Sequence, residues 1–280
     1  MTLGELRAAV AQVVDSKDVT GQRRDAIHLL SGVLGMRPGD VVLRADREVP
    51  PADAERALIA ARRYAEGVPL AYATGSAAFR ALELLVDDRV LIPRPETEGL
   101  VDRVLAWQAV RGPGGVAVDV GTGSGCIALS LATEGRFDRV IGIDQSAAAL
   151  VVARANGVRV GATVEWCEGD LLAPVRDVTP VVIVSNPPYI AEAEWEHLAP
   201  GVRDHEPRMA LVADDEGMAL TARLAREAFS CLRVGGLLAV EVDSARAERA
   251  CEYAREAGFG DVSVAADLFG RPRYLLAIKE

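Results

Sequence analysis

Residues 181–190 join an apolar run to a rigid polar turn that could hold a planar group bearing an NH2. The run at 181–184 is Val-Val-Ile-Val, as expected of a strand buried on both faces. An asparagine follows it with a side-chain amide, and the two prolines after it have no N–H, so the carbonyl groups of this turn keep acceptor capacity. The next residue adds an aromatic face. We interpret these four residues as catalytic, with an ordinary Pro-rich turn as the alternative: Asn186, Pro187, Pro188 and Tyr189.

A second group of residues could bind a nucleoside. A glycine turn follows the strand expected at 116–120, and it reads Gly121, Thr122, Gly123, Ser124 and Gly125. Glycines let the backbone approach a ligand, and the helix that starts next directs N–H groups toward it. The following strand ends in Asp144, about 20 positions beyond Gly123, where a carboxylate can bind both hydroxyls of a ribose. These residues leave a nicotinamide dinucleotide and S-adenosylmethionine open, although position 126 is Cys where GxGxxG has its third glycine.

The elements that must position these residues alternate between strand and helix. Strands are expected at 116–120, 139–143, 163–167 and 180–185, with helices from 126 and over 146–156. This order predicts an α/β fold with a mostly parallel sheet. After the third strand, Asp170 and Leu171 stand at a carboxyl end where the adenine of a cofactor would lie. A solvated turn is an equally good interpretation of those two residues.

The first part of the chain carries helical patterns. Thr2 and Glu5 have the spacing of a capping box, an apolar stripe at 26–34 closes with Gly35, and another follows Pro50 and Pro51. From residue 70 the period shortens, and 70–79, 82–86 and 90–92 are expected to be short strands. We therefore divide the chain into a helical substrate-recognition domain (1–66), a β-hairpin linker (67–92) and a catalytic domain (93–280). A purely structural role for the helices is left open.

Composition limits the classes of function. The chain has 280 residues, is 50% hydrophobic, and has a formal net charge of -10, which disfavours a broad surface for nucleic acid or an anionic membrane. It shows neither a signal peptide nor a membrane-spanning run, so we expect a cytoplasmic protein. Its 4 cysteines form no CxxC pair and its 3 histidines no HExxH motif, so we expect reduced thiols and no metal.

Four motifs together resemble the HemK/PrmC family of protein-(glutamine-N5) methyltransferases. They are Pro93-Arg94-Pro95-Glu96-Thr97-Glu98, the segment 119–129 around the glycine turn, Asn186-Pro187-Pro188-Tyr189, and Glu206-Pro207. The resemblance covers nearly the whole chain. It implies a class I S-adenosylmethionine-dependent methyltransferase fold, which is Rossmann-like with a C-terminal antiparallel hairpin, plus a small N-terminal helical domain. It also implies methyl transfer to the glutamine N5 of the Gly-Gly-Gln motif in peptide chain release factors.

The resemblance also implies roles for single positions. It places S-adenosylmethionine against residues 121–125, Asp144, Leu171 and Asn186, and the substrate glutamine against residues 186–189. At Leu171 some family members have an aromatic residue, so a stacking contact is expected to be missing here. The expected partner is a peptide chain release factor, with no stable nucleic acid, no membrane and no second subunit.

Two departures from the family pattern leave the substrate open. Glu241 is followed by Val-Asp where the family commonly has Ile-Gly, and the final hairpin carries a proline, Pro272, near the usual Gly-Arg-x-Arg ending. A diverged paralogue could methylate another protein or a small amide. An amino-methyltransferase of DNA or RNA bases shares the Asn-Pro-Pro-Tyr motif but would need a basic face. The acceptor of the released proton also stays open, with three candidates: Glu96, Glu98 and Glu206.

Overall fold

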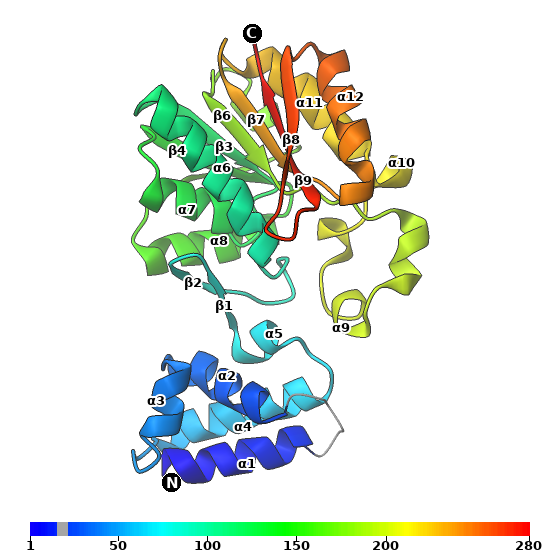
Figure 1. Ribbon diagram of the computed structural model, residues 1–280. Helices are drawn as coiled ribbons and strands as arrows, with labels where there is room; N and C mark the ends of the chain where they lie inside the picture. The colour runs from blue at the N-terminus through cyan, green and yellow to red at the C-terminus, as the bar shows by residue number, and fades with distance from the viewer. Residues whose placement is uncertain (16–21) are drawn as a thin grey trace. The chain divides into compact units, whose positions relative to one another are not determined.

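The computed structural model describes residues 1–15 and 22–280, and the chain divides into two compact units (Figure 1). The first unit comprises Met1–Ala77, Leu85–Asp88 and Ala199–Glu206. The second comprises Ala78–Leu84, Arg89–Leu198 and Pro207–Glu280. The domain boundaries expected after residues 66 and 92 remain predictions. Among the described residues, no helix combines the length and apolarity that crossing a bilayer requires.

The first unit is helical. Its helices are α1 (Leu3–Asp15), α2 (Gln22–Leu34), α3 (Pro38–Leu43), α4 (Pro51–Ala65), α5 (Leu70–Thr74) and α9 (Pro200–Arg203). The expected capping box is present, since the Thr2 N–H donates to Glu5 Oε2 at 2.8 Å and the Glu5 N–H donates to Thr2 Oγ1 at 3.2 Å. Fully buried Leu3, Leu6 and Leu30 belong to one apolar core that the first, second and fourth helices share.

The strands expected between 70 and 92 are only partly right. Residues 70–74 form helix α5, because Pro69 precedes them with a favourable φ and Gly75, at φ 76°, ends the turn. The hairpin is shorter than expected and consists of β1 (Ser76–Phe79) and β2 (Leu82–Leu85). Residues 90–92 form no strand; two prolines at 93 and 95 follow them, and neither can donate to a ladder.

The second unit contains a sheet of seven strands in the order β5-β4-β3-β6-β7-β9-β8 (Figure 1). The strands are β3 (Val116–Val120), β4 (Arg139–Asp144), β5 (Glu165–Glu168), β6 (Val182–Ser185), β7 (Leu237–Glu241), β8 (Asp261–Ala266) and β9 (Pro272–Ile278). The first five in this order pair in parallel, and β9 runs antiparallel to both of its neighbours. The fold class expected from the sequence is confirmed, and the strands lie within a few residues of the expected ranges.

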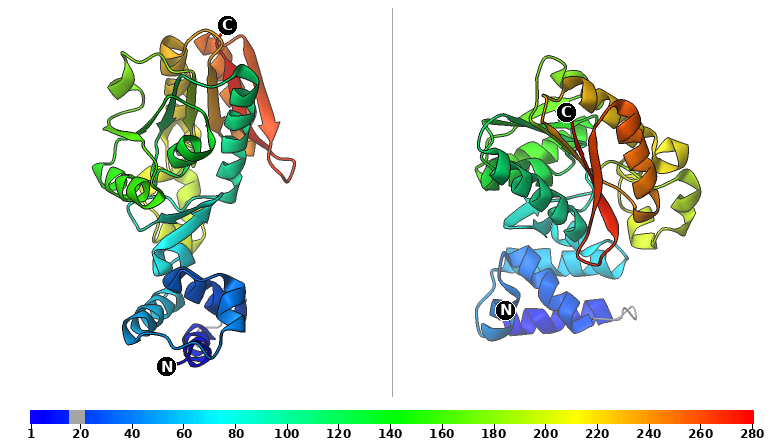
Figure 2. Two further views of the ribbon diagram at one scale, coloured as in Figure 1. Left: turned by 90° about the vertical axis from the view of Figure 1, so that its left-hand side faces the viewer. Right: turned by 45° about the horizontal axis from the view of Figure 1, so that its top comes forward.

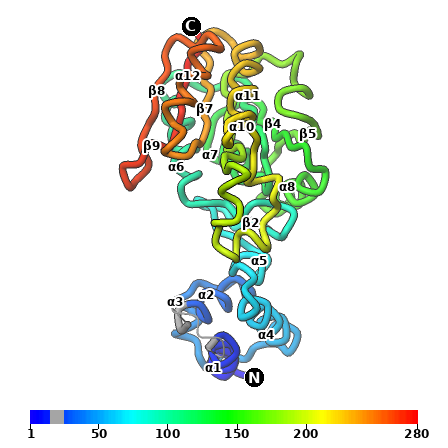
Figure 3. Tube along the Cα trace, turned by 90° about the vertical axis from the view of Figure 1, so that its right-hand side faces the viewer, coloured from blue at the N-terminus to red at the C-terminus, as the bar shows by residue number. Residues whose placement is uncertain are grey.

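Helices cover both faces of this sheet (Figure 2). The longer helices are α6 (Pro95–Arg111), α7 (Cys126–Glu134), α8 (Ala147–Val160), α11 (Ala219–Cys231) and α12 (Ala247–Ala257). Short helical turns are α10 (Asp214–Gly217), Ala173–Val175, Glu192–His197, Arg208–Ala210 and Ser244–Arg246. Successive strand residues alternate between faces: Ala117 packs in the core with α6 and α7, and Val118 packs in the core with α11 and α12. The turn between β8 and β9 projects from the unit as a loop (Figure 3).

The order of the strands defines a place for a ligand. The chain goes from β3 to β4 on one side and later returns to β6 on the other side of β3, so the strand order reverses at β3. In open parallel sheets, ligands bind at such a reversal, outside the carboxyl ends of the strands. Gly121, Asp144 and Asn186 all come from this edge of the sheet.

Candidate functional site

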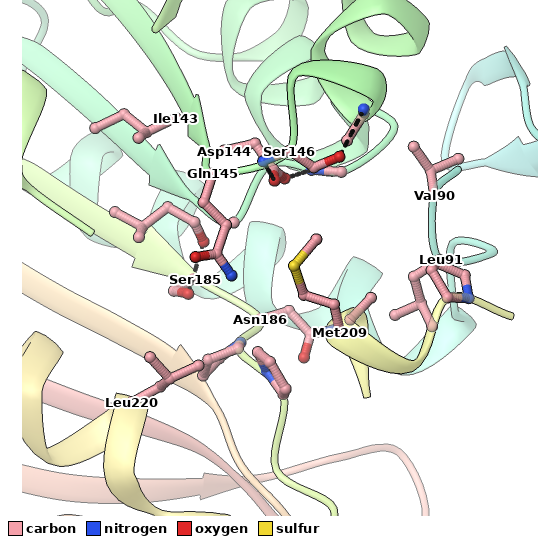
Figure 4. A pocket seen from close by; sticks show the side chains of 18 of the residues that line it. Val90, Leu91, Ile143, Asp144, Gln145, Ser146, Ser185, Asn186, Met209 and Leu220 are labelled. Carbon is pink, nitrogen blue, oxygen red and sulfur yellow. Dashed lines mark hydrogen bonds between the residues drawn. The ribbon is translucent and has the colours of Figure 1, made fainter. Parts of the chain in front are cut away.

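A cavity lies at the carboxyl ends of β3, β4 and β6, with about 820 Å³ of empty space that includes its opening to solvent (Figure 4). Eight of the predicted site residues line it: Gly121, Gly123, Asp144, Asp170, Leu171, Asn186, Pro187 and Pro188. Four predicted residues are not part of its lining: Thr122, Ser124, Gly125 and Tyr189. On the side opposite Ile143, the cavity is closed by Val90 and Leu91, which sequence reasoning placed in a strand.

The glycine turn divides into an open part and a packed part. Gly121 and Gly123 have φ values of 72° and 54°, and a Cβ added at either would meet no atom within 4 Å. A side chain there would be strained and would project into open space beside the cavity. A Cβ on Gly125 would instead lie 2.8 Å from the ring of Trp166. Close packing therefore explains the third glycine, whereas ligand approach explains the first two.

A buried carboxylate, Asp119, holds the glycine turn from below. Its Oδ2 accepts a hydrogen bond from the Thr122 hydroxyl at 2.6 Å and one from the Ala128 N–H at 3.1 Å. Asp119 is fully buried, and burial raises its pKa to about 7, more than the two hydrogen bonds lower it. Thr122 thus turns its side chain away from the cavity and joins β3 to the start of α7.

Asp144 at the end of β4 links two backbone segments beside the cavity. Its Oδ2 accepts from the Gly123 N–H at 2.9 Å, and its Oδ1 accepts from the Ser146 N–H at 2.9 Å (Figure 4). Burial raises the pKa of this carboxyl, while the backbone hydrogen bonds lower it. Because each carboxylate oxygen can accept a second hydrogen bond, Asp144 can still bind hydroxyl groups in the cavity.

Asp170 and Leu171 follow β5 and form another part of the cavity wall. Asp170 contacts Arg223 at 2.6 Å, and both side chains remain substantially exposed, so this ion pair contributes little stability. Leu171 has a φ of 47°, a left-handed conformation that costs a branched residue about 1–2 kcal/mol. This backbone conformation places the apolar, buried Leu171 side chain in the cavity wall, where a flat ring could lie against it.

Asn186 presents an amide whose orientation is fixed from behind. Its Nδ2 donates to the Thr97 hydroxyl oxygen at 3.1 Å, and Thr97, in the first turn of α6, is only 2% exposed. The Asn186 oxygen therefore remains available in the cavity. Next to it, the Ser185 hydroxyl donates to the Val120 carbonyl at 2.7 Å and fixes β6 against β3. Burial raises the pKa of Tyr189 to about 12, and its ring does not line the cavity.

Comparison with known proteins agrees with this geometry. Residues 5–75 match the family described as PrmC N-terminal domain, and residues 102–199 match the Methyltransferase small domain family. The release factor glutamine methyltransferase of Streptomyces coelicolor is 38% identical over 288 aligned positions, covering 100% of this chain and 98% of that protein. The chain belongs to the release factor glutamine methyltransferase family.

Solved structures of other methyltransferases share the fold of this family member. A methyltransferase from Pyrococcus furiosus has a TM-score of 0.53 at 20% identity, covering 72% of this chain and 90% of that one. The T. Thermophilus 16S rRNA methyltransferase RsmC, in complex with AdoMet and guanosine, has a TM-score of 0.50 at 18% identity, covering 73% of this chain and 50% of that one. At these identities the likeness concerns the fold alone.

Sequence reasoning missed one carboxylate that lies near the site of this family member. Glu241, the last residue of β7, is 1% exposed, and burial raises its pKa to about 7, although a hydrogen bond with Thr97 lowers it. Its Oε2 is buried without a hydrogen-bond partner. The available signal was an acidic residue at the carboxyl end of an apolar strand, the position that Asp144 occupies on β4.

The carboxylates considered as proton acceptors lie elsewhere. None of Glu96, Glu98 and Glu206 lines the cavity. The Glu98 carboxylate accepts from the Arg80 N–H at 2.9 Å, and Glu206 belongs to the first compact unit. All four cysteines are free, and no group of three or more His, Cys, Asp or Glu in residues 1–15 and 22–280 is arranged to hold a metal ion.

Proposed function

We propose that this chain transfers the methyl group of S-adenosylmethionine to the side-chain nitrogen N5 of a glutamine in a peptide chain release factor, within its Gly-Gly-Gln motif. The observation that carries the proposal is the Asn186 amide, whose nitrogen is committed to Thr97 and whose oxygen is left for the cavity. A substrate NH2 needs such an acceptor. The names of the relatives supply the release factor as the substrate to test first.

The cavity residues fit S-adenosylmethionine. Asp144 would hold the ribose hydroxyls with its remaining acceptor capacity, and the open positions at Gly121 and Gly123 would let the cofactor pass close to the backbone. Ile143 and Leu171 would provide apolar contact for the adenine. When bound, S-adenosylmethionine supplies an electrophilic methyl group on a positively charged sulfur.

The residues of the chain compensate for the weak nucleophilicity of an amide. Its nitrogen lone pair is delocalised into the carbonyl group, which keeps the amide planar. Acceptors at the Asn186 oxygen and at a carbonyl of the Pro187-Pro188 turn would draw on both N–H groups and stabilise the positive charge that develops on nitrogen. Alignment of the reacting atoms at about 3–3.5 Å contributes several kcal/mol more in such reactions. The N–H becomes acidic only after transfer, so no strong base is required.

The proposal includes two further parts. The helices of residues 1–66 would recognise the release factor, because they contain a core of their own and none of the residues that line the cavity. The enzyme would work as a monomer in the cytoplasm, where its protein substrate is found. A formal net charge of -10 argues against a stable complex with nucleic acid.

Methyl transfer to a set of acceptors tests the proposal. The purified chain is incubated with tritium-methyl S-adenosylmethionine and a release factor, the same release factor with its Gly-Gly-Gln glutamine changed to asparagine, free glutamine, or a DNA or RNA oligonucleotide. Label should enter only the intact release factor, and peptide mass spectrometry should locate one methyl group on that glutamine. Label in the oligonucleotide or in free glutamine, with none in the release factor, would refute the proposal.

A further inference from the structure

Three polar side chains from separate elements form a continuous chain behind the cavity. Asn186 Nδ2 donates to Thr97 Oγ1 at 3.1 Å, and Thr97 is in turn hydrogen-bonded to the carboxyl of Glu241. Thr97 and Glu241 are 2% and 1% exposed. Only Asn186 reaches the cavity.

The strand register explains how these groups meet. In the parallel pairing of β6 and β7, Ser185 lies beside Val240, so the next residues, Asn186 and Glu241, lie at the same level. Val184 and Ala239 belong to the core shared with α6, and strand residues two apart point to the same face. Both polar groups therefore point toward α6, which packs against β7 and supplies Thr97 from its first turn.

The chemistry of the three groups sets the direction of the hydrogen bonds. An ionised Glu241 can only accept, so the Thr97 hydroxyl must donate to it. The oxygen of that hydroxyl can then only accept from Asn186, which turns the Asn186 NH2 toward Thr97 and the amide oxygen toward the cavity. Without the carboxylate, a threonine hydroxyl could equally donate to the Asn186 oxygen, and the amide could turn its NH2 to the substrate.

Burying the Glu241 carboxylate costs free energy that its hydrogen bonding does not recover. Its Oε2 has no hydrogen-bond partner, and an unpaired polar atom in the interior is strongly unfavourable. A glutamine or a leucine of similar volume would avoid most of the cost of burying a charge. The retained charge is accounted for if it orders Thr97 and, through it, the amide that binds the substrate.

We propose that Glu241, acting through the Thr97 hydroxyl, is a positioning residue that fixes the Asn186 amide with its oxygen toward the substrate nitrogen. This inference rests on the proposed methyl transfer to an amide. Neither Thr97 nor Glu241 needs to contact the substrate or the cofactor, since neither lines the cavity. Loss of either should lower kcat and leave binding of S-adenosylmethionine almost unchanged.

The orientation should also depend on pH. Burial raises the pKa of Glu241 to about 7, so its carboxyl is increasingly protonated below that value and no longer forces Thr97 to donate. Turnover should therefore fall as the pH decreases through about 7. Charged or titratable groups from each neighbouring element act on this carboxyl or feel its charge: Arg94, Glu96, Cys126, Tyr189, Arg273 and Tyr274.

Steady-state kinetics with the full chain and a release factor tests the inference. Removing a catalytic hydrogen bond directly costs about 10²–10³-fold in kcat, and we expect about 10-fold for Thr97→Val because the acceptor stays in place but loses its orientation. Thr97→Ser keeps the hydroxyl and should restore turnover. Glu241→Gln should lower kcat and abolish its decrease below pH 7. Ser130→Ala, which removes another buried hydroxyl, bonded to the Cys126 carbonyl at 2.8 Å, should behave as wild type.

A second measurement, by NMR, follows the hydrogen bonds among Asn186, Thr97 and Glu241 without using the reaction. In 15N-labelled protein, the side-chain NH2 signal of Asn186 is assigned by its absence in Asn186→Ala. It should shift between pH 6 and 8.5 in the wild type, and should not titrate in Thr97→Val or Glu241→Gln.

The two measurements separate the failure of the inference from that of the proposed function. If the wild type methylates no release factor, the function is wrong, and the NMR titration still decides whether Glu241 orients Asn186. Unchanged kcat in Thr97→Val, failure of Thr97→Ser to restore turnover, or a titration of the Asn186 signal that persists in Glu241→Gln would each overturn the positioning role.

Discussion

The candidate site has two halves, the glycine turn with Asp144 and the turn at residues 186–189. Two buried carboxylates support these halves in different ways. Asp119 lies near the end of β3 beneath the glycine turn, and Glu241 ends β7 behind residues 186–189, the proposed amide-binding residues. Burial raises the pKa of each to about 7. Each carboxylate is hydrogen-bonded to a threonine, Thr122 or Thr97, and each has one oxygen without a partner.

The difference lies in where their partners come from. The groups that donate to Asp119 are 3 and 9 residues away along the chain, so the turn and its support form one local unit. Behind the amide-binding residues, Thr97 is 89 residues from Asn186, and Glu241 comes from a third element. A local unit can keep its shape when distant packing changes. The second group depends on how β6, β7 and α6 pack together.

The largest effect should come from the group that faces the substrate. Asn186→Ala removes the acceptor for the substrate NH2 and should reduce turnover about 10²–10³-fold. Asn186→Asp keeps an acceptor and should fall between the alanine variant and the wild type. Binding of S-adenosylmethionine, measured by calorimetry on the same preparations, should weaken far less. If lost cofactor affinity accounted for the whole decrease, Asn186 would belong to the cofactor half.

The next effect should appear in cofactor binding. Asp144→Ala removes a charged acceptor, and a loss of about 1–3 kcal/mol corresponds to roughly 5- to 150-fold weaker binding of S-adenosylmethionine. Asp138→Ala is the matched control, because its carboxylate also accepts from a glycine N–H, that of Gly115 at 2.7 Å, but it precedes β4 at the opposite edge of the sheet. Equal affinity in both variants, with unchanged circular dichroism, would remove Asp144 from the binding site.

The comparison also explains what the sequence could predict. The glycine turn and Asp144 were predicted to lie together because strand, turn and acid follow each other closely, and Gly121, Gly123 and Asp144 do line one cavity, while their contact with a cofactor stays a prediction. That Thr122 faces Asp119 is a matter of side-chain direction within the turn, which spacing does not encode. Thr97 and Glu241 lie far apart in the chain, so their contact depends on the order of the strands.

The short elements between the two helical patterns were harder to predict. Residues 70–79 are apolar enough for a strand, but Pro69 and Gly75 limit the first five residues to one helical segment. Residues 90–92, Val-Leu-Ile, form a short apolar run that is typical of a buried strand, yet Val90 and Leu91 line the cavity. In both places the competing signal was the backbone preference of a neighbouring proline or glycine.

A smaller effect should distinguish the two threonines. Thr122→Val leaves Asp119 with the Ala128 N–H alone and should lower the free energy of unfolding by about 1–3 kcal/mol. At saturating S-adenosylmethionine its kcat should stay near the wild-type value, because the amide-binding residues are untouched. Thr97→Val should lower kcat as well as stability, because it removes the hydrogen bond that the buried Glu241 carboxyl makes with Thr97. Chemical denaturation and steady-state kinetics measure both, and a loss of kcat in Thr122→Val would show that the two halves are coupled.

The last effect is a change in how stability depends on pH. Asp119 has a pKa of about 7 in the native protein against a usual value of 3.8, so between these values the native state holds a proton that the unfolded state has released. Stability from this group is therefore fully present below about pH 4 and is lost as the pH rises through about 7. The slope is at most about 1.4 kcal/mol per pH unit for one proton. Asp119→Asn should remove that part of the slope in urea denaturation between pH 4.5 and 7, and Glu241→Gln should remove a similar part by the same argument. If both slopes decrease and only Glu241→Gln changes the pH profile of kcat, both carboxyls hold a proton in the native protein below about pH 7 but serve different halves of the site. An unchanged slope in Asp119→Asn would mean that Asp119 is ionised in the folded protein.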